Sequence, residues 1–181
     1  GNTIAVAKWF QDFLRTLDSF LLWPWRRYCN SNATFIGQQI DRMLCIFLEL
    51  LIQRELPHLH ACCVLAHCSL PAICQRWITR SFWSYLRWPQ VVEFLVIPLL
   101  CGADYVAYFC VSLLHFLSAD IQQHAIDGDL FEFVTCTHLR DGFHILSNQT
   151  IIAELHHYET LYRSYYNSLL NELLQPYLTP G

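Results

Sequence analysis

Apolar residues recur every three or four positions along most of this chain, which is the spacing of an amphipathic α-helix. The first such segment ends at Pro24 and places these apolar residues on one face: Val6, Phe10, Phe13, Leu14, Leu17, Phe20 and Leu21. A polar stretch, NSNAT, separates it from a second predicted helix over residues 35–55, which Pro57 ends. A proline lacks the amide N–H that a helix interior needs, so both prolines mark helix boundaries.

The same helical spacing continues along the rest of the chain. Further helices are predicted over residues 59–67, 70–86, 90–100 and 103–117, then two short ones with N-caps at Ser118 and Asp127, and a long last one from Asn148 to about Leu174. No segment alternates with the period of two that a half-buried β-strand shows. The pattern therefore predicts an all-α domain of seven to nine helices, packed helix on helix.

The segment 70–86 is rich in aromatic residues. Trp77 and Phe82 fall on the apolar side of the predicted helix together with Ile78 and Tyr85, which predicts that they are buried in the core. Trp83 lies about 100° further round the helix than Phe82. It is therefore the better candidate for an exposed residue that anchors a protein partner, since tryptophan is enriched at interface hot spots.

Composition narrows the function classes. The chain has 181 residues, of which 54% are hydrophobic and 14% charged, while charged residues make up about 25% of a typical globular domain. We expect such a domain to pack against another domain or subunit. The net charge of −4 argues against a nucleic-acid surface, because such a surface needs clustered positive charge.

The sequence also argues against a secretory signal peptide and against a membrane-spanning helix. The N-terminus has no basic segment followed by an uninterrupted apolar run, so no signal peptide is predicted. The apolar stretch from Phe94 to Ala119 is divided by Pro98, Gly102 and Asp104 into runs shorter than the roughly 18 residues of a spanning helix. Two buried helices around a turn fit this stretch better. The nine cysteines are expected to be reduced thiols in the cytoplasm.

One run of motifs resembles a known family. Pro57 and Leu59 begin a helix, Trp77 and Phe82 follow, Trp88 opens the next helix, and Gly102 and Asp104 form a turn before a long apolar helix. This order resembles the C-terminal half of a TBC domain, the all-helical fold of Rab GTPase-activating proteins. It is most similar to the divergent TBC-like domain of the broad-minded family of ciliary proteins. The resemblance is good from about Met43 to Phe143 and weaker to the C-terminus. The TBC-like domain is therefore expected over residues 35–181, and residues 1–34 are expected to form an N-terminal helix and loop of uncertain membership.

The resemblance implies a question about catalysis. Active TBC proteins use an Arg from an I-x-x-D-x-x-R motif and a Gln from a Y-x-Q motif to stabilise phosphoryl transfer and orient water. This chain has no Y-x-Q, and its nearest counterpart of the Arg motif runs from Ile36 to Arg42 with Gln39 in place of the Asp. Arg42 is more simply a solvated arginine on an amphipathic helix. Either the two motifs lie outside this chain or the domain is catalytically silent.

The densest chemical motif is LPHLHACCVLAHCSLPAIC, from Leu56 to Cys74. Its histidines and cysteines raise the possibility of a zinc site, since zinc takes four Cys or His ligands. It contains no C-x-x-C pair, however, and free cysteine is among the most buried residue types. We expect buried thiols here, no bound metal and no other cofactor. His144, His156 and His157 are expected to be solvated or hydrogen-bonded.

Three functions remain open. The first is a catalytically silent interaction module, a scaffold or pseudo-GAP, that binds a small GTPase, a kinase or a ciliary adaptor at the cilium, basal body or centrosome. The second is part of an active Rab GTPase-activating domain whose Arg and Gln lie outside this chain. The third is a zinc-stabilised helical module. Besides Trp83, candidate partner-binding residues are Trp23 and Trp25, which lie beside two arginines near the N-terminus.

Overall fold

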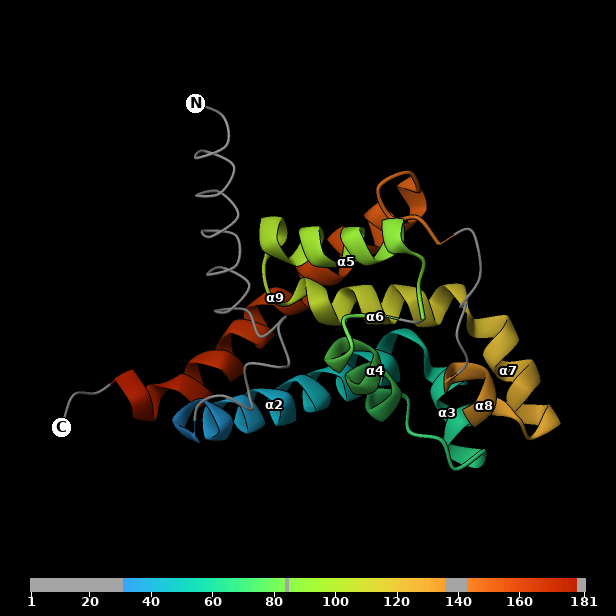
Figure 1. Cartoon of the computed structure of the whole chain (residues 1–181), viewed down its shortest axis with the longest axis horizontal. Helices are drawn as coiled ribbons and strands as arrows, with labels where there is room; N and C mark the ends of the chain where they lie inside the picture. Colours follow the sequence, from blue (N-terminus) through green and yellow to red (C-terminus); the bar gives the residue numbers. More distant parts are fainter. Residues whose placement is uncertain (1–30, 84, 136–142, 179–181) are drawn as a thin grey trace.

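The computed structural model describes residues 31–83, 85–135 and 143–178, and within these ranges every regular element is an α-helix (Figure 1). The helices are α2 (Ser31–Glu55), α3 (Pro57–Leu65), α4 (Leu70–Thr79), α5 (Trp88–Cys101), α6 (Tyr105–Phe116), α7 (Ser118–Asp127), α8 (Leu130–Thr135) and α9 (Gln149–Leu178). The all-α prediction is confirmed. The predicted helix before Pro24 lies outside the described residues.

Helix ends follow the local sequence in several places. Pro57 is the first residue of α3, where its missing N–H costs no hydrogen bond. The Ser69 hydroxyl accepts a hydrogen bond from the Ala72 amide at 3.4 Å and caps α4. Asn148 caps α9 as predicted, because its side-chain oxygen accepts from the amide of Thr150 at 3.0 Å.

The predicted helix over residues 70–86 is wrong in its second half. α4 ends at Thr79, and the chain then turns through Ser81 and Phe82, both of which have positive φ angles of 49° and 58°. The Phe82 ring is fully buried against Phe94 and Phe109, with ring centroids 4.6 and 5.1 Å apart. Burial of this ring outweighs the cost of a backbone conformation that bulky residues rarely adopt.

Two predicted N-caps are also wrong. Ser118 is the first residue of α7, and the N-cap position belongs to the buried Leu117, which joins α6 directly to α7. Asp127 is the last residue of α7 and is followed by Gly128, whose φ of 82° ends the helix in the left-handed conformation. Leu117 is buried at the first junction, whereas Asp127, Gly128 and Asp129 are exposed at the second.

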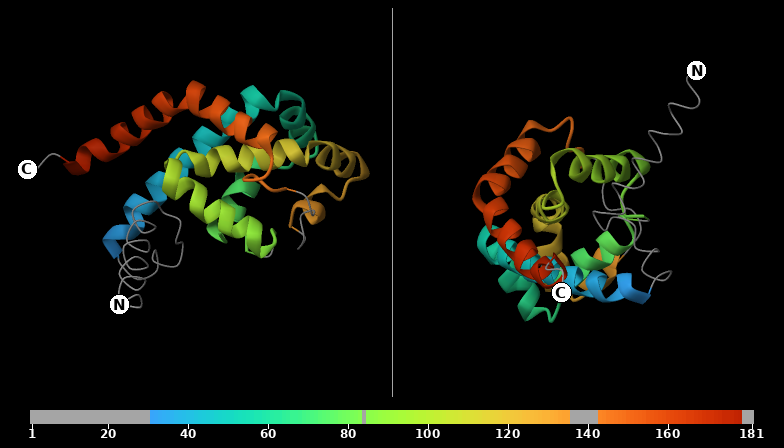
Figure 2. Two further views of the ribbon diagram at one scale, coloured as in Figure 1. Left: turned by 90° about the horizontal axis from the view of Figure 1, so that it is seen from above. Right: turned by 90° about the vertical axis from the view of Figure 1, so that its left-hand side faces the viewer.

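α6 is the central helix of the domain. Every residue from Tyr105 to Leu114 is buried, and α6 packs against α2, α5, α7 and α9. In the end-on view of Figure 2, α6 lies inside a ring formed by α2, α5 and α9. This arrangement explains why the sequence of α6 is apolar on all sides. Among the described helices, α5 packs on α6, and its Val92 and Leu100 are exposed.

Among the described residues, none of the helices taken singly has the length and apolar character needed to span a membrane. Two bent pairs, α3 with α4 at 98° and α6 with α7 at 64°, meet the requirement by length and composition alone. In the second pair, the residues of α6 from Tyr105 to Leu114 are buried inside the protein.

Candidate protein-binding surface

The family positions Trp77 and Phe82 are buried, as the helical pattern predicted. Both side chains are fully inaccessible to solvent, and their rings lie 5.8 Å apart. The Trp77 indole N–H donates a hydrogen bond of 3.2 Å to the carbonyl of Val134 in α8. Trp77 therefore holds α8 against α4, which is a structural role.

Trp83 and Trp88 are exposed instead. They are 61% and 60% accessible and pack edge to face, with ring centroids 5.6 Å apart. Trp83 lies in the turn after α4 and Trp88 is the first residue of α5. The prediction that Trp83 is exposed is confirmed. The sequence pattern predicts Trp88 only as the residue that opens a helix. Trp88 meets Trp83 because the chain turns at Phe82.

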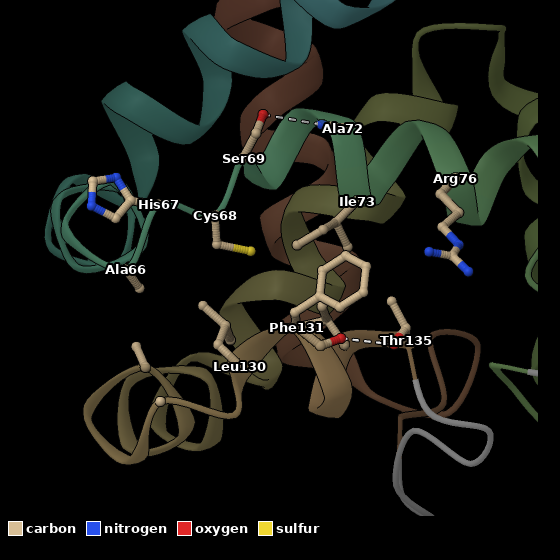
Figure 3. A pocket seen from close by; sticks show the side chains of 13 residues that line it. Ala66, His67, Cys68, Ser69, Ala72, Ile73, Arg76, Leu130, Phe131 and Thr135 are labelled. Atoms are coloured by element: carbon tan, nitrogen blue, oxygen red, sulfur yellow. Dashed lines mark hydrogen bonds between the residues drawn. The ribbon is translucent and has the colours of Figure 1, made fainter.

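A pocket of about 430 Å³ lies between α4 and α8. Figure 3 shows its walls, with Cys68, Ile73 and Arg76 on one side and Leu130, Phe131 and Thr135 on the other. Its lining is mostly apolar, and Phe131 at its edge is 66% exposed. Arg76 is the one side chain in the lining that carries a permanent charge. This geometry accommodates an apolar side chain that has an acidic group beside it.

Gly102 and Asp104, the remaining family positions in the second half of the motif, belong to an ion-pair network. The buried Asp104 carboxylate accepts hydrogen bonds from Arg163 of α9, at 2.8 Å to Nε and 3.2 Å to Nη2. Glu159 also pairs with Arg163 and accepts from the Tyr105 hydroxyl at 2.5 Å. The network joins α9 to the turn between α5 and α6, and we assign it a structural role.

Arg163 does not stand out in the sequence, because a single arginine on a long amphipathic helix is usually a solvated residue. Asp104 is the sequence feature that points to such a pair. It is the one acid between Phe94 and Ala119, and an ionised carboxylate among apolar residues requires a partner. Which arginine supplies it depends on how α9 packs.

The Cys/His segment does not form a metal centre in the described part of the chain. No three His, Cys, Asp or Glu side chains there are grouped so as to hold an ion. Cys63 and Cys74 are buried, and burial raises the pKa of the Cys63 thiol to about 12. His60 instead hydrogen-bonds Glu49 of α2 at 2.9 Å. Pro57 and Leu59 start α3, with Leu59 buried in the core.

The other candidates are dispersed. Arg42 lies exposed on α2, beside Gln75 of α4. Trp23 and Trp25 lie outside the described residues. The three histidines that were expected to be solvated or hydrogen-bonded are largely exposed and lie near carboxylates: His144 near Glu93 at 3.8 Å, His156 near Glu159 at 3.3 Å and His157 near Glu55 at 3.9 Å.

Comparison with known proteins identifies the family. Residues 1–175 match the family model described as the broad-minded protein Rab TBC domain. The chain belongs to this family. It is 31% identical over 166 residues to protein broad-minded of Danio rerio, and 30% identical over 139 residues to protein broad-minded of Mus musculus. These alignments cover 89% and 74% of the chain.

The relatives are much longer than this broad-minded TBC-like domain. The aligned region spans 12% of the zebrafish protein and 11% of the mouse protein. No solved structure matches the chain.

Proposed function

We propose that this TBC-like domain is a catalytically silent protein-interaction module, a scaffold or pseudo-GAP, within a broad-minded-type protein. The observation that carries the proposal is the exposed Trp83–Trp88 pair. Two adjacent tryptophans with about 60% of their surface in water are unusual for a residue type that is highly buried on average. Tryptophan is also enriched at the centres of protein interfaces, where it contributes much of the binding energy.

The sequence supports the catalytically silent part of the proposal. The chain contains no Y-x-Q motif, and its I-x-x-Q-x-x-R segment has Gln39 where the motif that supplies the catalytic arginine has Asp. Arg42 of that segment lies on the exposed surface of α2, close to Asp41 and Gln75. An arginine finger contributes roughly 10³ to 10⁵ in rate to GTP hydrolysis, so a domain without one stimulates hydrolysis weakly or not at all.

The partner classes follow from the family. A small GTPase, a kinase or a ciliary adaptor each fits a TBC-like domain of the broad-minded family, and the site of action is then the cytoplasmic side of the cilium, basal body or centrosome. A fluorescent fusion of the full-length protein that concentrates at the ciliary base supports this placement. A diffuse or secretory distribution contradicts it.

GTP hydrolysis tests the proposal directly. The purified chain is mixed with a panel of GTP-loaded Rab proteins, and release of inorganic phosphate is measured. We expect rates equal to those of the Rab proteins alone. Stimulation of about 100-fold, which is small beside the effect of an arginine finger, would show that the domain is an active GTPase-activating fragment. The Arg42→Ala variant then shows whether Arg42 is responsible.

A further inference from the structure

Acidic residues are absent from the middle of the chain. Between Leu56 and Val92 there is no Asp or Glu, although the whole chain has 15 acids and a net charge of −4. The same segment holds three arginines, Arg76, Arg80 and Arg87, and all three are exposed. The chain therefore concentrates positive charge on α4 and on the turn that leads to α5.

These charges adjoin the exposed tryptophans. Arg76 lies in the last turn of α4, and Arg80, four residues later, is the C-cap residue of this helix. The carbonyl of Arg80 accepts a hydrogen bond of 2.8 Å from the amide of Trp83, so the two residues belong to one tight turn. Arg76 borders the apolar pocket and extends toward Thr135 (Figure 3). Arg76, Arg80, Trp83 and Trp88, here called the Arg–Trp surface, thus run from the pocket to the start of α5.

From this surface we infer that the domain binds an acidic segment of a protein partner, one in which Asp or Glu residues flank apolar side chains. The inference rests on the proposed function and adds the chemistry of the partner. Carboxylates of the segment pair with Arg76 and Arg80, an apolar side chain packs on Trp83 and Trp88, and a second enters the pocket beside Phe131. Arginine and tryptophan are the residue types that dominate such contacts.

An anionic membrane is the competing ligand, because tryptophan and arginine also gather at membrane surfaces. Recognition of acidic lipids generally requires about four to eight clustered Lys or Arg residues. The segment from Leu56 to Val92 has three arginines and no lysine, with one arginine in α4 and two in the turn between α4 and α5. This charge suits a few carboxylates on one peptide better than a charged lipid surface.

Selection from a phage library of random peptides tests the inference. The bait is the purified chain. We expect the recovered peptides to be enriched in Asp and Glu next to Leu, Phe or Trp, and the best of them, synthesised with Asn and Gln in place of the acids, to lose binding. Recovery of no binding peptide, or of peptides without an excess of acids, overturns the inference.

Variants locate the contact. Arg80→Glu and Trp83→Ala are each expected to lower the affinity for the selected peptide by about 30-fold, the loss typical of an interface hot spot. Arg54→Glu makes the same charge change on an exposed residue of α2, and Leu100→Ala removes an apolar side chain that is 79% exposed. Both controls should bind like the parent chain. Equal weakening by Arg54→Glu and Arg80→Glu would show a diffuse charge effect and overturn the inference.

Vesicles distinguish the two kinds of ligand. Co-sedimentation with phosphatidylserine vesicles that depends on Arg80 and Trp83, without any selected acidic peptide, would assign the surface to a membrane and overturn the inference. None of these outcomes alters GTP hydrolysis by the Rab panel. Failure of the acidic-peptide inference is therefore distinguishable from failure of the catalytically silent interaction module.

Discussion

Arg163 and Asp104, 59 residues apart in the sequence, form an ion pair with two hydrogen bonds, the shorter of which is 2.8 Å. The Asp104 side chain is 5% exposed and that of Arg163 35%. Arg163 also donates to the carbonyl of Cys101 at 2.5 Å and lies over the Tyr105 ring at 5.5 Å. One side chain of α9 therefore holds the end of α5 and the start of α6 together.

Replacing Arg163 by Met should destabilise the fold. The substitution leaves the buried Asp104 carboxylate without its partner, and we expect a loss of about 2–3 kcal/mol in the free energy of unfolding, since removal of one member strands a buried charge. Urea denaturation followed by circular dichroism measures it. Arg54→Met, which removes an exposed arginine from α2, should change stability by less than about 0.5 kcal/mol. Equal effects of the two variants would contradict a structural role for the pair.

Gly102 is required by the same network. Its φ of 128° lies where only glycine is comfortable, and a Cβ there would lie 2.7 Å from Oδ1 of Asp104. Gly102→Ala should therefore cost about 2–3 kcal/mol, from backbone strain together with displacement of the ion pair. Gly128 is the matched control, because its φ is 82° and a Cβ there meets no atom within 4 Å. Gly128→Ala should cost about 1 kcal/mol, and an equal loss at both sites would show that the contact with Asp104 is unimportant.

Acid should weaken the network through Glu159. The hydrogen bond from the Tyr105 hydroxyl, assisted by His156 and Arg163, lowers the pKa of Glu159 below its ordinary value of 4.5. A carboxylate with a lowered folded-state pKa stabilises the fold above pH 4.5 and loses this contribution as the pH falls through the folded-state value. The stability difference between the parent chain and Glu159→Gln should therefore be constant above about pH 5 and should shrink below it.

Chemical denaturation at a series of pH values measures this difference. Glu172→Gln removes an exposed acid from the same helix and controls for the change in net charge. A difference for Glu159→Gln that stays constant down to about pH 3 would contradict a lowered pKa.

The cysteine-rich segment should be chemically inert at its centre. Cys63 is 1% exposed, and burial raises the pKa of its thiol to about 12. A reagent therefore reaches the sulfur poorly, and little of the reactive thiolate is present near neutral pH. In the folded chain, iodoacetamide at pH 8 should modify the partly exposed Cys62 well before Cys63. Mass spectrometry of the peptides measures both sites. Unfolding in guanidinium should remove the difference, and equal rates in the folded chain would contradict burial of Cys63.

Removal of metal should leave the domain unchanged. We expect elemental analysis to find no stoichiometric zinc and a chelator to leave the thermal midpoint where it was. Cys62→Ala and Cys68→Ala should both keep the helical spectrum, because the two residues are only partly buried. Loss of the fold in either variant, together with released zinc, would restore the reading of a zinc-stabilised module.

The apolar pattern predicted helices well where one face is buried and a proline or a cap marks the end. Pro57 and Asn148 behave in this way, and the start of α3 and the cap of α9 follow from them. The pattern failed after Thr79, because Phe82 comes four residues after Ile78 and so continues the helical face of Ile78. The ring of Phe82 is buried whether the helix continues or turns, so periodicity cannot distinguish the two.

The amino-acid sequence is enough to infer the helical class, the family, the lack of acids between Leu56 and Val92 and the burial of Trp77. These properties depend on composition, local spacing and motif order. Three other features depend on how the chain folds: Trp83 packs on Trp88, Arg163 is the partner of Asp104, and α4 and α8 line a pocket. Each joins residues on different elements, and such contacts follow from how the helices pack around α6.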